Sequence, residues 1–355
     1  MKTGKKNIRV MLVDDSLLAI TMLKRILATA PDIEVVATCH NGRDAINLLP
    51  QVRPDVICTD YHMPVMDGLA MTEYIMAHHP TPILVVSVSV QQQGDEENIF
   101  RLLEAGAIDV CPKPLGGLAA DYTTIQEELV NKIRLLSGVV AIGKRHKPIP
   151  PLSKLPKTAP LTNRPAIVAI GASTGGPQTI SAILGRLSAD FPAPIVCVQH
   201  ISTGFQAGLI SWLNSHTPLQ VREAKPGEKP EAGTVYFPVE GYHLIIDNTG
   251  RLQAIAGEPI DGHCPSITAT FSSIAAYYQQ ASVAILLTGM GRDGAKGLLE
   301  ISRAGGTTVA QNEESCIVFG MPAEAIKLGA AQHILAPEEI AQLLTNRIRF
   351  QKIKL

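Results

Sequence analysis

The segments IRVMLVDDS at 8–16 and AIVAIGASTGGP at 166–177 each place a short apolar run directly before polar or glycine residues. A run of about six apolar residues without alternation is typical of a strand buried on both faces, as in a parallel sheet covered by helices. Each segment is followed by residues whose apolar positions have helical spacing, so each predicts a strand, a turn and a helix. Each segment opens one half of the chain.

The alternation of strands and helices continues through both halves. The expected strands are 8–13, 34–37, 56–59, 83–86 and 108–111 in the first half, and 166–170, 195–199, 235–239, 283–288 and 307–311 in the second. Residues 242–257 are expected to form a hairpin. This pattern predicts an α/β protein with two doubly wound parallel-sheet domains.

A proline-rich and basic segment separates the two halves. Residues 137–164 combine several prolines with six Lys or Arg residues and no acidic residue. Proline lacks an amide donor and favours extended chain, which predicts a semi-rigid linker. No aromatic residue interleaves with the basic ones, so solvation explains the charge better than nucleic-acid binding. We therefore expect a first domain over 1–136, a linker over 137–164 and a second domain over 165–355.

Composition excludes several classes of protein. Of 355 residues, 46% are hydrophobic, and 31 Lys and Arg balance 32 Asp and Glu to a net charge of −1. These values exclude a disordered chain and a general attraction to nucleic acid or acidic membranes. No apolar run approaches the ~20 residues that cross a bilayer, and we expect a cytoplasmic protein without membrane insertion. The six cysteines are scattered and are expected to be reduced core thiols.

Acidic residues follow two of the expected strands in the first half. Asp14 and Asp15 end the first strand and Asp60 ends the third, while Ser87 ends the fourth and Lys113 follows the fifth. The carboxyl ends of parallel strands form the ligand crevice of an open sheet, so these side chains should converge. Three carboxylates suit Mg²⁺, and Asp60 is the natural phosphoryl acceptor, with Lys113 and Ser87 contacting the phosphoryl oxygens. The alternative is that the aspartates cap helices.

Four motifs in this half are VDDS at 13–16, DYHMPVMDG at 60–68, VVS at 85–87 and CPKP at 111–114. Together they resemble the receiver domain of two-component response regulators. The resemblance implies a flavodoxin-like fold and phosphorylation of Asp60 by a partner histidine kinase. It also implies Mg²⁺ held by Asp15, Asp60 and the His62 carbonyl, with Asp14 in support. Receivers usually carry Tyr or Phe three residues before the lysine, where this chain has Val110, so we do not expect the aromatic switch of that family here.

A glycine turn with a serine follows the first expected strand of the second half. The turn GASTGGP at 171–177 puts Ser173 at the amino end of a helix, where free amides can stabilise an anion. The turn fits the nucleophile motif G-x-S-x-G, and it fits a plain anion-binding turn as well. A nucleophilic serine needs a base and a carboxylate that orients the base. His200 and Asp293 each follow an expected strand and should share the carboxyl edge with Ser173. The other histidines and aspartates of this half are His216, His243, His263, His333, Asp190, Asp247 and Asp261.

The glycines around Asp293 support a competing interpretation. Gly289, Gly291 and Gly294 spell G-x-G-x-x-G between an expected strand and helix, and Glu313 follows at the distance of a ribose-binding acid. Such a motif normally opens its domain, whereas this one lies late in the chain. Asp293 would also place a negative charge beside a pyrophosphate, so we favour the hydrolase interpretation over a dinucleotide site.

The motifs GASTGGP at 171–177, VQH at 198–200, LLTGMGRDGA at 286–295 and GMP at 320–322 resemble the methylesterase domain of chemotaxis response regulators of the CheB type. The resemblance implies that Ser173, His200 and Asp293 hydrolyse glutamyl methyl esters of chemoreceptors to glutamate and methanol. Many members also deamidate receptor glutamines, and the ester hydrolysis needs no cofactor. Backbone amides at Thr174 and Met290 are expected to bind the oxyanion.

The order of the two domains predicts how the esterase is controlled. We expect the unphosphorylated receiver to cover the serine crevice, and phosphorylation to favour an open form. The expected partners are a chemotaxis histidine kinase and the methylated cytoplasmic helices of chemoreceptors, with no nucleic acid. The alternative function is a receiver joined to a non-catalytic signalling or ligand-binding output domain. A DNA-binding output is not expected, because the second half lacks a helix-turn-helix with a basic recognition helix.

Overall fold

A computed structural model describes residues 7–87, 96–114, 119–139, 141 and 165–349 of the chain. The chain divides into two units, Met1–Ser153 and Lys154–Leu355. The predicted linker at 137–164 lies almost wholly outside the described residues, so its character and the limits of the two domains stay predictions. Within the described ranges, every helix is too short or too polar to span a lipid bilayer.

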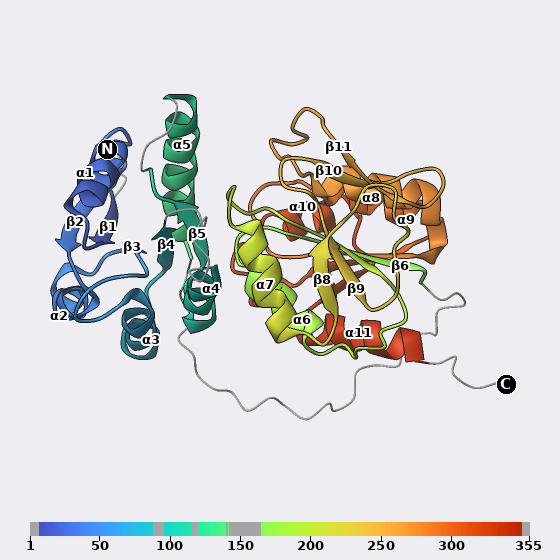
Figure 1. Cartoon of the computed structure of the whole chain (residues 1–355), viewed down its shortest axis with the longest axis horizontal. Coiled ribbons are helices and arrows are strands. Elements are labelled where there is room, and N and C mark those ends of the chain that lie inside the picture. Colours follow the sequence, from blue (N-terminus) through green and yellow to red (C-terminus); the bar gives the residue numbers. More distant parts are fainter. Residues whose placement is uncertain (1–6, 88–95, 115–118, 140, 142–164, 350–355) are drawn as a thin grey trace. The chain divides into compact units, whose positions relative to one another are not determined.

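The first unit is a five-stranded parallel sheet with helices on both faces. Its elements are β1 (Ile8–Val13), α1 (Leu17–Leu27), β2 (Ile33–Cys39), α2 (Gly42–Val52), β3 (Val56–Thr59), α3 (Gly68–His78), β4 (Ile83–Ser87), α4 (Glu96–Ala105), β5 (Asp109–Pro112) and α5 (Ala119–Leu136). The strand order is β2-β1-β3-β4-β5, which is the flavodoxin-like order. Helices α1 and α5 pack together on one face, and α2, α3 and α4 form a row on the other (Figure 1). The predicted fold of this half is confirmed.

Polar side chains outside the acidic cluster cap the two helices that follow β1 and β3. Ser16 accepts the Ala19 amide at 3.3 Å and caps α1, and Asp67 accepts the Ala70 amide at 2.8 Å and caps α3. The alternative in which the aspartates at the strand ends are helix caps is therefore wrong. Asp14 and Asp60 are left for another role.

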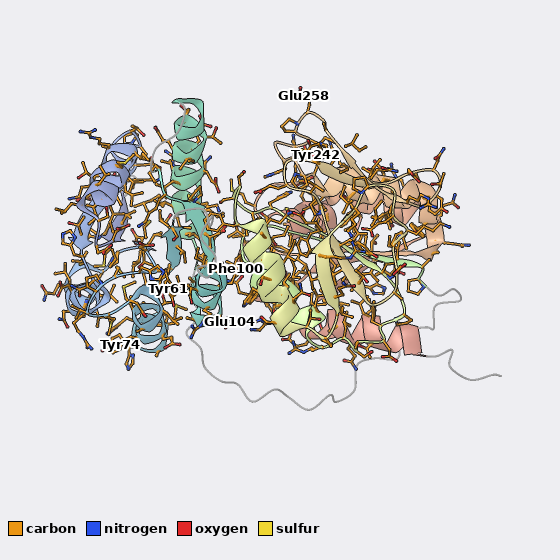
Figure 2. The ribbon with its side chains drawn as sticks, in the orientation of Figure 1. Tyr61, Tyr74, Phe100, Glu104, Tyr242 and Glu258 are labelled. Carbon is orange, nitrogen blue, oxygen red and sulfur yellow. The ribbon has the colours of Figure 1, made fainter. Side chains whose placement is uncertain are left out.

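The second unit is a seven-stranded parallel sheet with a separate antiparallel hairpin. Its elements are β6 (Ile167–Ala172), α6 (Gly176–Leu184), β7 (Ile195–Gln199), α7 (Gln206–His216), β8 (Gln220–Glu223), β9 (Thr234–Phe237), β10 (His243–Ile246), β11 (Leu252–Ile255), α8 (Ile267–Tyr278), η1 (Gln279–Ala281), β12 (Ser282–Leu286), α9 (Ala295–Arg303), β13 (Thr307–Gln311), η2 (Glu313–Ser315), α10 (Met321–Lys327), β14 (His333–Leu335) and α11 (Pro337–Arg349). The predicted hairpin is confirmed as β10 and β11. The hairpin packs on α8, and Figure 2 shows Tyr242 and Glu258 at this end of the unit.

The strand order of this sheet is β14-β13-β12-β6-β7-β9-β8. Strands β7, β8 and β9 therefore lie on one side of β6, and the later strands β12, β13 and β14 lie on the other, so the strand order reverses at β6. Helix α6, which follows β6, packs with α7 and α11, whereas α9, which follows β12, packs with α8 and α10 (Figure 1). The connections that leave β6 and β12 therefore go to opposite faces of the sheet. Such a reversal opens a crevice at the carboxyl ends of the two strands, where ligands of α/β proteins bind.

The sequence analysis needs two corrections, one about the strands of this unit and one about the cysteines. The edge strands β8 and β14 were not predicted, because they have only four and three residues and lack a continuous apolar run. Four cysteines are buried in the cores, but Cys264 and Cys316 are only half-buried, so the expectation that all six are core thiols is wrong for these two. Burial raises the pKa of the Cys58 thiol to about 12, so that thiol stays protonated.

Candidate phosphorylation site and candidate active site

Neighbouring strands of the first unit bring its three aspartates together. Val13 pairs with Thr59 in the β1 and β3 ladder, so the residues that follow them lie side by side. The carboxylate oxygens of Asp14, Asp15 and Asp60 lie within 4.8 Å of one another. Oxygens on opposite sides of a Mg²⁺ ion are about 4.2 Å apart, because each bond is about 2.1 Å long. Three hard oxygen donors at this spacing fit one divalent cation.

Lys113 lies between two of these carboxylates. Its Nζ is 2.7 Å from Asp14 Oδ2 and 2.6 Å from Asp60 Oδ2, and its backbone amide donates to the Ser87 carbonyl at 2.7 Å. Burial would lower the pKa of Lys113, but the hydrogen bonds with Asp14 and Asp60 outweigh it and raise the pKa. Burial also raises the pKa of Asp14, against the opposing effects of Lys113 and the Ser16 amide. Lys113 is therefore a charged donor beside Asp60.

Val110 occupies the position where receivers usually carry an aromatic side chain. It lies in β5, only 1% of it is exposed, and its carbonyl accepts a hydrogen bond from Lys132 Nζ. The Lys132 ammonium lies 3.1 Å from both Asp109 and Glu128, and these carboxylates raise its pKa against the effect of burial. A short side chain enclosed in this way has no ring to move toward the phosphorylation site.

The register of the second sheet places Ser173 beside His200. Ala172 of β6 pairs with Gln199 of β7, and the His200 amide donates to the Ala172 carbonyl at 2.9 Å. Ser173 and His200 are therefore the first residues beyond the ends of two adjacent strands. Ser173 is half-buried in the turn before α6, where Gly175 adopts a φ of 76° that favours glycine.

Asp293 approaches His200 from the loop after β12. Its Oδ2 lies 3.0 Å from His200 Nε2, and both side chains are nearly fully buried. The other ring nitrogen, His200 Nδ1, is buried and has no hydrogen-bond partner within the described ranges. When Nε2 donates to the carboxylate, Nδ1 carries the lone pair, so Nδ1 is the atom that can take a proton.

The first turn of α8 holds the Asp293 carboxylate. The groups that donate to it, besides His200, are the hydroxyl of Ser266 and the amides of Ile267, Thr268 and Gly294, at 2.8–2.9 Å. Burial by itself would raise the pKa of Asp293, but the hydrogen bond and charge of His200 and the bonds from Thr268 hold the pKa well below its usual range. The carboxylate is therefore a fixed anion that orients His200.

His263 is a feature of the site that the sequence analysis did not select. Its ring stacks on that of His200 with centroids 3.8 Å apart and planes 10° apart. The neighbouring Asp261 has a φ of 50° and accepts a hydrogen bond from Arg292 at 2.8 Å, which ties this loop to the one that carries Asp293. His263 was one of five histidines in the domain, and no local pattern distinguished it, because the stacking partner is 63 residues away in the sequence.

We expect His263 to make the second unit less stable in mild acid. Burial and the electrostatic effect of His200 lower the pKa of His263 from 6.5 to about 4, although Asp293 and Asp261 oppose them. Between these pH values the unfolded chain binds a proton that the folded chain does not, so the free energy of unfolding falls as the pH falls from 6.5 to 4. Urea unfolding at pH 7 and pH 4.5 should therefore show a smaller loss in His263→Gln than in wild type. His216→Gln, at an exposed position, is the control; equal losses in wild type and His263→Gln would contradict this expectation.

The loop after β12 also lies against the serine. A Cβ placed on Gly289 would come within 2.6 Å of Ser173 Cβ, so only glycine permits this approach. The next residue, Met290, has 52% of its surface exposed to solvent, and its backbone amide makes no hydrogen bond within the described ranges. An amide in this position can donate to a developing oxyanion. Thr174, the other predicted donor, is buried in the turn that follows Ser173.

Two other histidines of the domain have structural contacts. His243 accepts the Ser266 amide at its Nδ1 and contacts the Glu258 carbonyl at its Nε2, and His216 packs against Trp212. The dinucleotide interpretation also loses support, because the Gly294 amide at the start of α9 already donates to Asp293 and Thr268. Amides used in this way do not bind a pyrophosphate.

The fold and the two sites define a response regulator whose output domain has the geometry of a serine hydrolase. A family model described as the response regulator receiver domain matches residues 10–119, and one described as CheB methylesterase matches residues 168–344. Relatives that match nearly the whole chain show that it belongs to the family of protein-glutamate methylesterases/protein-glutamine glutaminases. A member from Hahella chejuensis is 40% identical over 95% of this chain and 97% of its own length. A member from Nitrosospira multiformis is 41% identical over 96% and 97%.

A solved structure supports the same assignment for the second unit. The catalytic domain of the Thermotoga maritima CheB methylesterase is 37% identical, with a TM-score of 0.50. The match covers 52% of this chain and 99% of that domain. The predicted α/β fold of the second half is confirmed.

Proposed function

We propose that this chain hydrolyses glutamyl methyl esters on chemoreceptors, deamidates receptor glutamines, and is activated by phosphorylation of Asp60. The observation that carries the hydrolase function is the buried His200 and Asp293 pair, which stands beside Ser173 at the strand reversal of the sheet. Family membership supports the substrate, because relatives are named as protein-glutamate methylesterases and protein-glutamine glutaminases.

The first half of the reaction forms an acyl-enzyme. His200 Nδ1 takes the hydroxyl proton of Ser173 as Oγ forms a bond to the γ-carbonyl carbon of the methyl ester. The carbonyl oxygen becomes an oxyanion, which the Met290 amide and an amide of the turn at Thr174 stabilise. Collapse of this intermediate breaks the bond to the methoxy oxygen, which leaves as methanol with the proton from His200. Asp293 stabilises the imidazolium while it carries that proton.

The second half releases glutamate. A water molecule gives one proton to His200 Nδ1 as its oxygen attacks the acyl carbon, and the proton passes to Ser173 Oγ when the ester bond breaks. Glutamine enters the same sequence with ammonia as the leaving group. Every proton and bond is supplied by water and by these side chains, so the hydrolysis requires no cofactor.

Phosphorylation uses the acidic cluster of the receiver. Asp15 and Asp60 would hold Mg²⁺ with Asp14 beside them, and the cation would neutralise charge on the transferred phosphoryl group. An Asp60 oxygen attacks the phosphorus of the kinase phosphohistidine, and the histidine leaves. Lys113 and the Ser87 hydroxyl then contact the oxygens of the aspartyl phosphate. The kinase partner is inferred from the receiver fold.

We expect Asp60→Asn to abolish stimulation of the esterase by a small phosphodonor and Mg²⁺ while leaving its basal rate. An amide cannot accept the phosphoryl group, and the basal rate depends on the second unit. Methanol release with and without acetyl phosphate measures the effect, and EDTA should remove the stimulation of wild type. Asp67→Asn is the matched control, because Asn also caps a helix, so stimulation should persist. Stimulation that survives in Asp60→Asn would contradict the assignment of the acceptor.

Methanol release from a methylated chemoreceptor fragment tests the proposed function directly. Wild type with phosphodonor should release methanol in proportion to the methyl ester lost, and ammonia from a fragment that carries glutamine at the same positions. Absence of both products, with Asp60 still phosphorylated, would favour the alternative of a receiver with a non-catalytic output domain.

A further inference from the structure

Gln199, the last residue of β7, reaches both residues of the proposed nucleophile and base pair. Its Nε2 donates to the Ser173 carbonyl at 2.8 Å and to the His200 carbonyl at 2.7 Å. The side chain is 3% exposed. Because both partners are carbonyl oxygens, only the amino group of the amide can face them, which fixes the orientation of the side chain.

These two hydrogen bonds continue the sheet where its backbone ladder stops. The ladder between β6 and β7 ends with Ala172 and Gln199, and the His200 amide makes the last bond, to Ala172. Beyond that point Ser173 enters the turn to α6 and His200 enters the loop to α7, so no strand pairing sets their separation. The Gln199 amide hydrogen-bonds both carbonyls and so links the two segments where backbone hydrogen bonds between β6 and β7 have ended.

The other end of the Gln199 amide is held by packing. Its Oε1 is buried and has no hydrogen-bond partner within the described ranges. A Cβ placed on Gly176 would come within 1.9 Å of this oxygen, so the glycine makes room for it. A buried carbonyl without a donor is unfavourable for stability, and native proteins keep such groups at a few sites only. Reversal of the amide would relieve nothing, because it would point the oxygen at two carbonyls.

We propose that Gln199 is a positioning residue that sets the distance between Ser173 Oγ and His200 Nδ1. This role rests on the proposed function, in which these two atoms exchange a proton. Gln199 touches neither substrate nor the reacting atoms and acts through the two carbonyls. Its loss should therefore slow the chemical step and leave substrate binding nearly unchanged, because a small misplacement of reacting groups costs up to about 100-fold in rate.

Two substitutions of Gln199 test this role, each with a matched control. Gln199→Met removes both donated hydrogen bonds, and Gln199→Glu removes both at neutral pH while keeping the shape of the side chain. Gln206 is the control position, because it is also 3% exposed and its Nε2 also donates two hydrogen bonds, to Glu223 at 2.9 Å and to the Pro238 carbonyl at 2.7 Å. Gln206→Met therefore reports the cost of losing two buried hydrogen bonds elsewhere in the domain, and Gln206→Glu adds to this loss the repulsion between its carboxylate and Glu223.

We expect both Gln199 variants of the full chain to lower kcat by about 10–100-fold with KM within about threefold. Labelling of Ser173 by a fluorophosphonate should slow by a similar factor, because it needs the same proton transfer but no receptor. The Gln206 variants should change both rates by less than about threefold at a similar melting temperature. Losses that are equal at the two positions, or that appear in KM alone, would overturn the positioning role. Label that persists in Ser173→Ala would instead overturn the proposed triad, so the two failures are distinguishable.

Discussion

Ser173→Ala should lower kcat for methanol release by about 10⁵-fold, because the proposed mechanism forms the acyl-enzyme on the Ser173 hydroxyl, which alanine lacks. The oxyanion donors and substrate binding remain, so a small rate above that of water is expected to persist. The stability of the fold should change little, since Ser173 donates no hydrogen bond through its hydroxyl within the described ranges and is only half-buried. Gas chromatography of methanol, with circular dichroism on the same sample, measures both quantities.

A second serine of the same region controls for the substitution. Ser181→Ala removes a half-buried hydroxyl from helix α6, which begins at the turn that carries Ser173, and should leave kcat within about twofold. Wild-type activity in Ser173→Ala would remove the nucleophile from the mechanism. In that case the glycine turn would be a plain anion-binding turn, the alternative that the sequence left open.

Asp293→Asn should lower kcat by about 10⁴-fold, the scale found when the orienting aspartate of a serine hydrolase becomes an amide. The carboxylate accepts hydrogen bonds at both oxygens, and an Asn side chain must turn its amino group toward some of those donors. If the amino group faces His200, the imidazole has to change tautomer and Nδ1 loses its lone pair. If it faces Thr268 and Gly294, two amides lose their acceptor.

The same substitution should destabilise the second unit by about 1–3 kcal/mol, because at least one buried donor is left without a partner. Asp247→Asn is the matched control: Asp247 also accepts several hydrogen bonds, from Thr249, Arg251 and Gln253, but it lies in the exposed turn of the hairpin. Methanol release and urea unfolding should separate the two variants, with Asp247→Asn within about twofold of wild type in rate. A kcat for Asp293→Asn near that of the control would show that Asp293 has only a structural role.

The parts of the molecule that could be predicted have signals confined to a few neighbouring residues. The runs at 8–13 and 167–172 are strands because most of their residues are apolar and become buried when helices cover both faces of the sheet. The glycine turns after them could be recognised from their residues alone. The polar edge strands β8 and β14 were missed, because an edge strand needs no apolar run, and its partner supplies the hydrogen bonds.

The site residues divide in the same way. Ser173, His200, Asp293 and the receiver aspartates could be proposed because each lies directly after a strand or in the loop that follows one, and parallel strands bring their carboxyl ends to one edge. Their roles in catalysis stay predictions until the variants are measured. His263 and Gln199 could not be proposed from the sequence. The ring stacking of His263 and the hydrogen bonds of Gln199 to two carbonyls require no recognisable pattern of neighbouring residues.

By itself, the sequence determined that this protein has two parallel α/β sheets and which residues stand at their carboxyl edges. Only the tertiary structure decided that β6 lies between β7 and β12, that Asp293 rather than another aspartate meets His200, and that Nδ1 is the nitrogen left free. The physical reason is the distance along the sequence between the residues that interact. Strand formation depends on residues that are close in the sequence. Strand order and side-chain pairing depend on packing between segments that are far apart in the sequence, such as His200 and Asp293, which are separated by 93 residues.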